Sequence, residues 1–324
     1  VLLSVRGEEA LATLLVELDN LREAVRWRLN GGETGAALRL VGALHPFVYC
    51  YLLTEAGVWA EAALHLPGAE ARTPQRAKAL LTAGHTALRQ GDFRAGQAYY
   101  AESAVLWHEF GEQRWEGWAR VMESLCTLDP PTRLARAEAG GALLRRAGHP
   151  WDVAASLVWL GAAHQGLGHE DQAETALREA IDLGRSLGEP QLGPPLYFLG
   201  LIRESRADYA AARGLYEQSL AAHRAAGDMS NMARTLERLG VTVLHEGDVP
   251  RDPPLIRESL QLRRELGILA GVTGCLDAFA QVAARLGRPA VAARLFGAAD
   301  GARSQAALSL PVTLVGILNR AVAE

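Results

Sequence analysis

The residues that could perform catalysis or hold a nucleotide are few and widely spaced along this chain. A Walker-type phosphate-binding loop needs a lysine inside Gly-Lys-Ser/Thr, but the one lysine, Lys78, lies between two alanines. Residues 166–168 start like a dinucleotide fingerprint but lack its third glycine. Residues 184–188 match the G-x-S-x-G string of serine hydrolases, which needs a strand-to-helix elbow, whereas here the string closes a helical pattern. We therefore expect no nucleotide cofactor and no catalytic serine.

Metal ligation and disulfide chemistry are equally poorly supported. The three cysteines, Cys50, Cys126 and Cys275, are odd in number and far apart, which fits neither a disulfide framework nor a metal-ligand cluster. The His-Glu pairs lack the second histidine of a zinc-binding helix. We expect no metal site, no catalytic residue and no enzyme activity, and the cysteine usage fits a reducing cytoplasm.

Two amphipathic helices joined by a tight turn are predicted over residues 151–190. Val153, Leu157, Leu160 and His164 recur at helical spacing and share one face. Glycines or turn residues recur along the chain at intervals of about 37–40 residues. The turns within the helix pairs are expected at Gly91, Asp129, Gly168, Ala207, Gly247 and Gly287, and the ends of the second helices at Gly111, Gly148, Gly188, Gly227 and Gly267. Such a period predicts a solenoid of helical hairpins, because one hairpin cannot bury its apolar face alone.

Composition sets further bounds on the function. Of 324 residues, 49% are hydrophobic and 22% charged, and the formal net charge is −4, so no charge excess favours nucleic acid or an anionic membrane as a partner. No apolar run reaches the length of about 18–20 residues that a membrane-spanning helix needs. The sequence opens at Val1 within an amphipathic run. We therefore expect a segment of a longer protein.

Small residues recur on the first helices and again on the second helices. They are Gly84, Gly161, Gly200, Gly240 and Ala280, followed twelve residues later by Gly96, Ala173, Ala212, Asp252 and Ala292. Four residues after these come Tyr100, Leu177, Tyr216, Ile256 and Phe296. This scheme resembles the tetratricopeptide repeat. Asp252 is the one position that does not fit.

A narrower resemblance rests on three segments. Residues 17–27 are similar to the E-x-x-N-L-R-x-A-x-x-W segment that leads into the repeats of large bacterial signalling ATPases. Residues 224–228 resemble the ends of those repeats, and residues 292–299, followed by Pro311, resemble their closing helix. Those regulators are the MalT-like and LuxR-type proteins that couple a STAND or NB-ARC nucleotide switch to transcription. The resemblance implies a non-catalytic interaction and sensor region whose ATPase and DNA-binding modules lie in other parts of the full-length chain. A stand-alone adaptor without an attached ATPase is the alternative.

The fold expected is an all-α, right-handed, tetratricopeptide-like superhelix of about seven helix pairs. Its parts are N-terminal helices over residues 1–30, helical repeats over 31–302 and a capping segment over 303–324. Trp107, Trp115 and Trp118 cluster near Phe110. They fit either a core between repeats or a binding hot spot.

The resemblance also implies a groove lined by first helices. The positions that face it carry both charge signs, which favours a protein segment, a peptide or a small inducer over nucleic acid. The groove-facing residues are His85, Arg120, Gln165, Tyr197, Glu204, Arg234, Glu237, Asp277 and Gln281.

Overall fold

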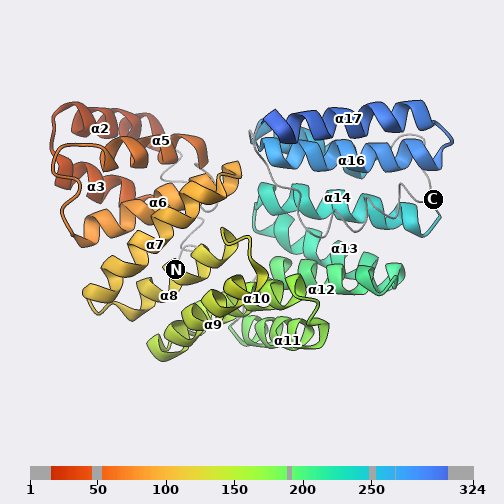
Figure 1. The fold of residues 1–324 in the computed structure, drawn as a ribbon, viewed down its shortest axis with the longest axis horizontal. Coiled ribbons are helices and arrows are strands. Elements are labelled where there is room, and N and C mark those ends of the chain that lie inside the picture. Colours follow the sequence, from red (N-terminus) through yellow and green to blue (C-terminus); the bar gives the residue numbers. More distant parts are fainter. Residues whose placement is uncertain (1–15, 46–52, 188–191, 248–252, 267, 306–324) are drawn as a thin grey trace. The chain divides into compact units, whose positions relative to one another are not determined.

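The structure, a computed structural model, describes residues 16–45, 53–187, 192–247, 253–266 and 268–305. Within these ranges the chain forms fifteen helices and no strand, so the predicted all-α fold is confirmed (Figure 1). The chain divides into two compact units, Val1–Ala163 and His164–Glu324. No helix among the described residues has the length and apolarity needed to cross a bilayer.

The first unit contains helices α2 to α9 and most of α10. Helix α6 packs against α7, α7 against α8 and α8 against α9, while α3 and α5 both pack on α6. From α2 to α9, each described helix thus contacts the next one along the chain, as expected for stacked hairpins. The bounds are α2 Leu18–Asn30, α3 Thr34–Ala43, α5 Leu53–Leu64, α6 Pro74–Gln90, α7 Phe93–Glu109, α8 Gln113–Leu125, α9 Pro130–Ala147 and α10 Pro150–Gly166.

The second unit continues the same plan. Helices α12 and α13 pair, as do α14 with α15 and α16 with α17, and α13 and α15 each contact the following first helix. Figure 1 shows the last pair as two antiparallel helices. The bounds are α11 Glu170–Ser186, α12 Gly193–Ser205, α13 Tyr209–Ala225, α14 Met229–His245, α15 Pro254–Glu265, α16 Leu269–Arg285 and α17 Pro289–Gln305.

At most of the expected turns, the helix ends at a residue whose backbone has the left-handed conformation, with positive φ. Gly91 has φ 84°, Gly168 74° and Gly247 95°, a region that glycine enters without a steric penalty. Ala207 has φ 57° at the equivalent turn and is the one non-glycine residue with positive φ in the described part of the chain. Asp129 differs, because its side chain caps the start of α9 by accepting a hydrogen bond from the amide of Thr132. Gly188 and Gly267 lie outside the described residues.

The first-helix glycines bring a large side chain of the second helix against the backbone. A Cβ added to Gly200 would lie 2.5 Å from Tyr216 Cε1, and one added to Gly84 would lie 2.9 Å from the same atom of Tyr100. Gly240 approaches Ile256 in the same way. The glycines therefore make room for the residue sixteen positions later, which is fully buried in each case. Asp252, the exception to the small-residue scheme, lies outside the described residues.

A serine hydroxyl joins the two helices of three hairpins. Ser103 donates to the carbonyl of Ala77, and Ser219 donates to that of Gly193, over the same separation of 26 residues. Ser259 repeats the bond to Ala233. The recurring Ser of the second helices is thus a structural link, since its buried hydroxyl satisfies a first-helix carbonyl.

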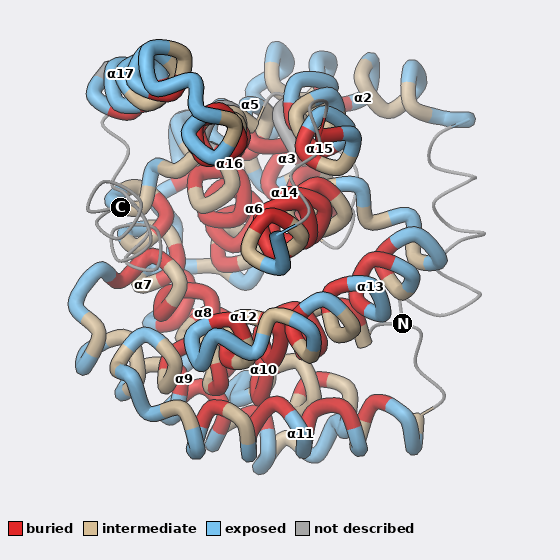
Figure 2. Tube along the Cα trace, turned by 90° about the vertical axis from the view of Figure 1, so that its right-hand side faces the viewer, coloured by how far each residue is buried: buried red, intermediate tan, exposed pale blue. Residues whose placement is uncertain are grey.

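Burial follows position in the stack. Figure 2 shows α14 buried along much of its length, and its buried residues run from Ala233 to Leu244 with few gaps. Helix α17 remains largely exposed on its outer side. The proposed capping segment 303–324 is described only for its first three residues, as part of α17.

Candidate functional site

All nine residues expected to face a groove lie on first helices of their pairs, but most are buried. His85, Tyr197 and Glu204 are 2%, 6% and 9% exposed, and Glu237, Asp277 and Gln281 are buried as well. Arg120, Gln165 and Arg234 are partly exposed. A groove open over all nine positions is therefore not what the structure shows. The side chains open to a partner are the partly exposed ones.

The two candidates of the first unit make separate contacts. Nδ1 of His85 lies 3.2 Å from the Tyr100 hydroxyl, and its ring meets the His45 ring edge-on at 5.9 Å. Burial lowers the pKa of His85 well below its usual value, and the neighbouring His45 and Arg89 lower it further. Arg120 donates to Glu116 on its own helix at 2.9 Å. His85 is thus part of the core and Arg120 part of a local ion pair.

The tryptophan cluster belongs to the core of the first unit. The Trp107 ring stacks on Trp115 with centroids 5.9 Å apart and meets Phe110 at a steep angle. Trp107 is 3% exposed. Trp115 and Trp118 are partly buried against a cluster that includes Tyr100 and Leu144. These contacts favour the core interpretation over the binding hot spot.

In the second unit, residues of α12 contact residues of α14, the next first helix. The Arg234 guanidinium of α14 lies 4.2 Å from the ring centre of Tyr197 on α12. Glu204 on α12 binds Arg238 on α14 and accepts a hydrogen bond of 2.7 Å from the Tyr216 hydroxyl. We call the group formed by Tyr197, Phe198, Glu204, Arg234 and Arg238 the α12–α14 face; Arg234 is its one partly exposed member, and the other four are buried.

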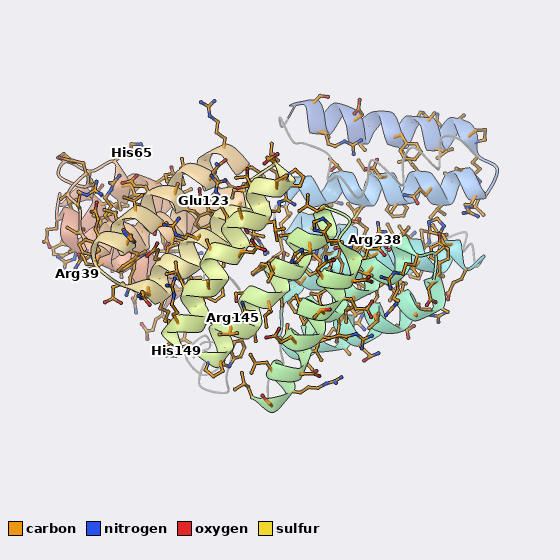
Figure 3. All side chains as sticks on the ribbon, turned by 60° about the horizontal axis from the view of Figure 1, so that its bottom comes forward. Arg39, His65, Glu123, Arg145, His149 and Arg238 are labelled. Carbon is orange, nitrogen blue, oxygen red and sulfur yellow. The ribbon has the colours of Figure 1, made fainter. Side chains whose placement is uncertain are left out.

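Ion pairing decides the charge state of Glu204. Burial acts to raise the pKa of this carboxyl, but the charge of Arg238 and hydrogen bonds from Arg238 and Tyr216 outweigh it, so the pKa is lowered. The carboxylate therefore stays ionised and holds Arg238 in place; Figure 3 labels Arg238.

Two further buried ion pairs repeat with the period of the hairpins. Glu237 pairs with Arg263 at 2.8 Å, and Asp277 pairs with Arg303 at 2.7 Å; all four side chains are less than 10% exposed. Glu237 and Asp277 are equivalent residues of successive first helices, and Arg263 and Arg303 are equivalent residues of the second helices. Both acidic candidates are therefore already neutralised within their own hairpin.

The arginine partners were not predicted from the sequence. Arg238, Arg263 and Arg303 lie 26 or 34 residues from the acids that they bind. A local pattern does not connect positions so far apart, although the repeated spacing of 26 residues in two consecutive hairpins is a signal that could have found two of the pairs.

A shallow, open pocket lies between α2 and α5 in the first unit. It is lined by Asp19, Arg22, Arg26, Glu55, Val58 and Trp59. Arg22 donates to Glu55 at 3.0 Å and to Asp19 at 2.8 Å, so its charge is already paired. Among the described residues no group of three or more metal-ligating side chains comes together.

Comparisons with known proteins support the repeat. A sequence model described as a tetratricopeptide repeat matches residues 154–185, which form the later part of α10 and nearly all of α11. A comparison with curated proteins finds no match.

Solved helical-repeat structures are similar to this chain in fold. A Rap protein complexed with competence and sporulation factor has a TM-score of 0.68 at 13% identity, with 85% of this chain and 76% of that chain covered. The Rap conjugation gene regulator of plasmid pLS20, in complex with the Phr* peptide, has a TM-score of 0.64 at 14% identity, covering 84% and 74%.

A third similar structure is a signal transduction ATPase with numerous domains (STAND) from Pyrococcus horikoshii, which has a tetratricopeptide repeat sensor. Its TM-score is 0.54 at 12% identity, and the match covers 96% of this chain and 49% of that chain. At these identities the likeness establishes a tetratricopeptide-like helical-repeat fold.

Proposed function

We propose that this chain is a non-catalytic interaction and sensor region of a bacterial signal-transducing transcriptional regulator. It binds a peptide or an extended protein segment on the first-helix side of its second unit. The observation that carries the proposal is the α12–α14 face, where Arg234 lies partly exposed over the aromatic rings of Tyr197 and Phe198. A planar cation on aromatic side chains is a common anchor for partners.

The regulator context is supported by the segment at residues 17–27 and by the similar fold of a STAND sensor. Peptide binding is supported by the similar fold of a regulator solved with a peptide. In such a regulator, binding would shift the population of a neighbouring switch only if the partner binds its two states with different affinity. The stand-alone adaptor remains the second candidate. Reading the complete coding sequence separates the two, because the regulator requires a phosphate-binding loop and a DNA-binding module beyond this segment.

Selection of binding peptides tests the interaction itself. Peptides recovered from a random displayed library should bind the native chain and lose most of their affinity for Arg234→Ala. A variant with both Tyr197 and Arg234 changed to Ala is less informative, because Tyr197 is 6% exposed and its removal also empties part of the core.

Arg224→Ala is the matched control, since Arg224 is an exposed arginine of α13 and lies on a second helix. Equal binding of the recovered peptides to Arg234→Ala and to the native chain would refute the assignment of this face. Recovery of no peptide would refute peptide binding altogether.

A further inference from the structure

Arg234 lies at the α12–α14 face, and no carboxylate in the described part of the chain compensates its charge. Its guanidinium carbon lies 4.2 Å from the Tyr197 ring centre and 5.3 Å from that of Phe198. Both aromatic rings are buried and meet each other edge-on at 83°, so the guanidinium lies against a buried aromatic corner. A guanidinium carries its N–H donors in its own plane. The Arg234 side chain as a whole is partly exposed, although its Nε is buried.

Other arginines of the second unit have carboxylate partners. Arg238 pairs with Glu204, Arg203 with Glu174 and Arg263 with Glu237. Among the described residues no carboxylate pairs with Arg234, and its buried Nε has no hydrogen-bond partner there. A buried donor without an acceptor is costly. Arg238 Nε also lacks a hydrogen-bond partner among the described residues, but the Arg238 guanidinium is paired with Glu204, so Arg234 differs in lacking a carboxylate.

Neither Tyr197 nor Asp228 supplies a negative charge that pairs with Arg234 among the described residues. Burial raises the pKa of the Tyr197 hydroxyl, so this group stays neutral. Asp228 accepts hydrogen bonds from the backbone and side-chain amides of Asn231 at the start of α14. Its Oδ2 also lies 3.8 Å from Nδ1 of the buried His223. Asp228 thus serves as a helix cap and is engaged elsewhere.

We propose that Arg234 is the anchor for a carboxylate of the bound peptide. The inference rests on the proposed function and specifies which group of the partner is recognised. The partner is an extended segment whose Asp or Glu side chain, or whose C-terminal carboxylate, pairs with the guanidinium. Arginine and carboxylate match as a planar pair with up to two hydrogen bonds. The aromatic rings beneath would exclude water from one side of that pair and strengthen it.

Synthetic dodecapeptide arrays test this inference with two sets of probes. The peptides have random sequences, and each is made once with a free C-terminal carboxylate and once with a C-terminal amide. The native chain should bind peptides enriched in Asp or Glu at one position, or should bind only those with a free carboxylate. The first result would identify an Asp or Glu side chain as the group that pairs with Arg234, and the second would identify the C-terminal carboxylate.

Two variants of Arg234 sharpen the test. Arg234→Gln should raise the dissociation constant of the selected acidic peptides about tenfold or more. This is the loss of affinity expected when a charge-assisted hydrogen bond is removed. Arg234→Glu should reverse the preference and select Lys or Arg at the same position. Arg224→Glu makes the same charge change on exposed α13 and should leave the acidic preference intact. Thermal melting of each variant confirms that it is folded.

The outcomes separate the two proposals. Selection of peptides without an acidic preference, or with the same preference in Arg234→Glu, would overturn the carboxylate anchor while peptide binding stands. Selection of no peptide by the native chain would overturn peptide binding and the anchor with it.

Discussion

At the scale of single residues, small and titratable side chains are placed by close contacts that the sequence only partly reveals. Gly200 belongs to the small-residue scheme found in the sequence, and the side chain that packs against it in the structure is Tyr216. Tyr197, Glu204 and Asp277 were placed on the correct helices, but their burial was not predictable. Helical spacing predicts the face of the helix on which a residue lies. Its burial depends on arginine and aromatic side chains of other helices that pack against it.

Enlarging Gly200 should destabilise the second unit. A Cβ at this position would lie 2.5 Å from Tyr216, so Gly200→Leu forces the buried tyrosine or α12 to move. We expect the free energy of unfolding to fall by about 1–3 kcal/mol in urea denaturation. Gly214→Leu is the matched control on α13, because nothing lies within 4 Å of an added Cβ there. Equal stability of the two variants would contradict the contact.

His223 should make stability depend on pH. Burial lowers its pKa to about 4, with Asp228 opposing and Arg234 adding to the shift. The unfolded chain, with a histidine pKa near 6.5, binds the proton more readily than the folded chain. The stabilisation is therefore complete above about pH 6.5 and is lost as the pH falls towards 4.

The measurement is the free energy of unfolding of the native chain and of His223→Gln at pH 7 and pH 5. The native chain should lose on the order of 1–2 kcal/mol more than the variant between these values. Parallel losses in the two proteins would show that His223 is accessible to protons in the folded state.

At the scale of helices and hairpins, the sequence was a good guide. The period near 40 residues, the turn positions from Gly91 to Gly287 and the all-α fold are confirmed, because a helix end leaves a local mark in glycine and capping residues. The packing between helices was harder to predict. Gly140 of α9 is an example, because an added Cβ there would lie 2.7 Å from the Gly117 carbonyl of α8.

The buried ion pairs of the hairpins should be strongly coupled. Asp277 and Arg303 are each less than 10% exposed, and burial raises the pKa of Asp277 even with Arg303 beside it. Arg303→Gln leaves an unpaired acid in the interior and should cost on the order of 3 kcal/mol. Asp277→Asn should also destabilise, and the double variant should lose less than the sum.

A double-mutant cycle in urea measures this coupling. The control cycle uses Arg213 and Glu217, an ion pair on α13 whose side chains are 49% and 52% exposed. We expect a coupling energy above about 1 kcal/mol for the buried pair and below about 0.5 kcal/mol for the exposed pair. Coupling energies of the same size would mean that burial adds nothing to the pair.

At the scale of the molecule, the two helical-repeat units differ in the polar and aromatic side chains that they contain. The first holds buried histidines, stacked tryptophans and the charge-paired pocket between α2 and α5. The second holds the α12–α14 face and the repeated ion pairs. We propose, as the sequence suggested, that residues 1–30 lead into the repeats and that 303–324 cap them. We propose that the second unit recognises the partner, because no carboxylate among the described residues pairs with Arg234.

The most direct test is a crystal structure of the chain with a peptide selected on the arrays. The account predicts that the peptide lies along α12 and α14, with a carboxylate oxygen within about 3 Å of the Arg234 guanidinium. A peptide bound on the exposed side of α13, or in the pocket between α2 and α5, would contradict it.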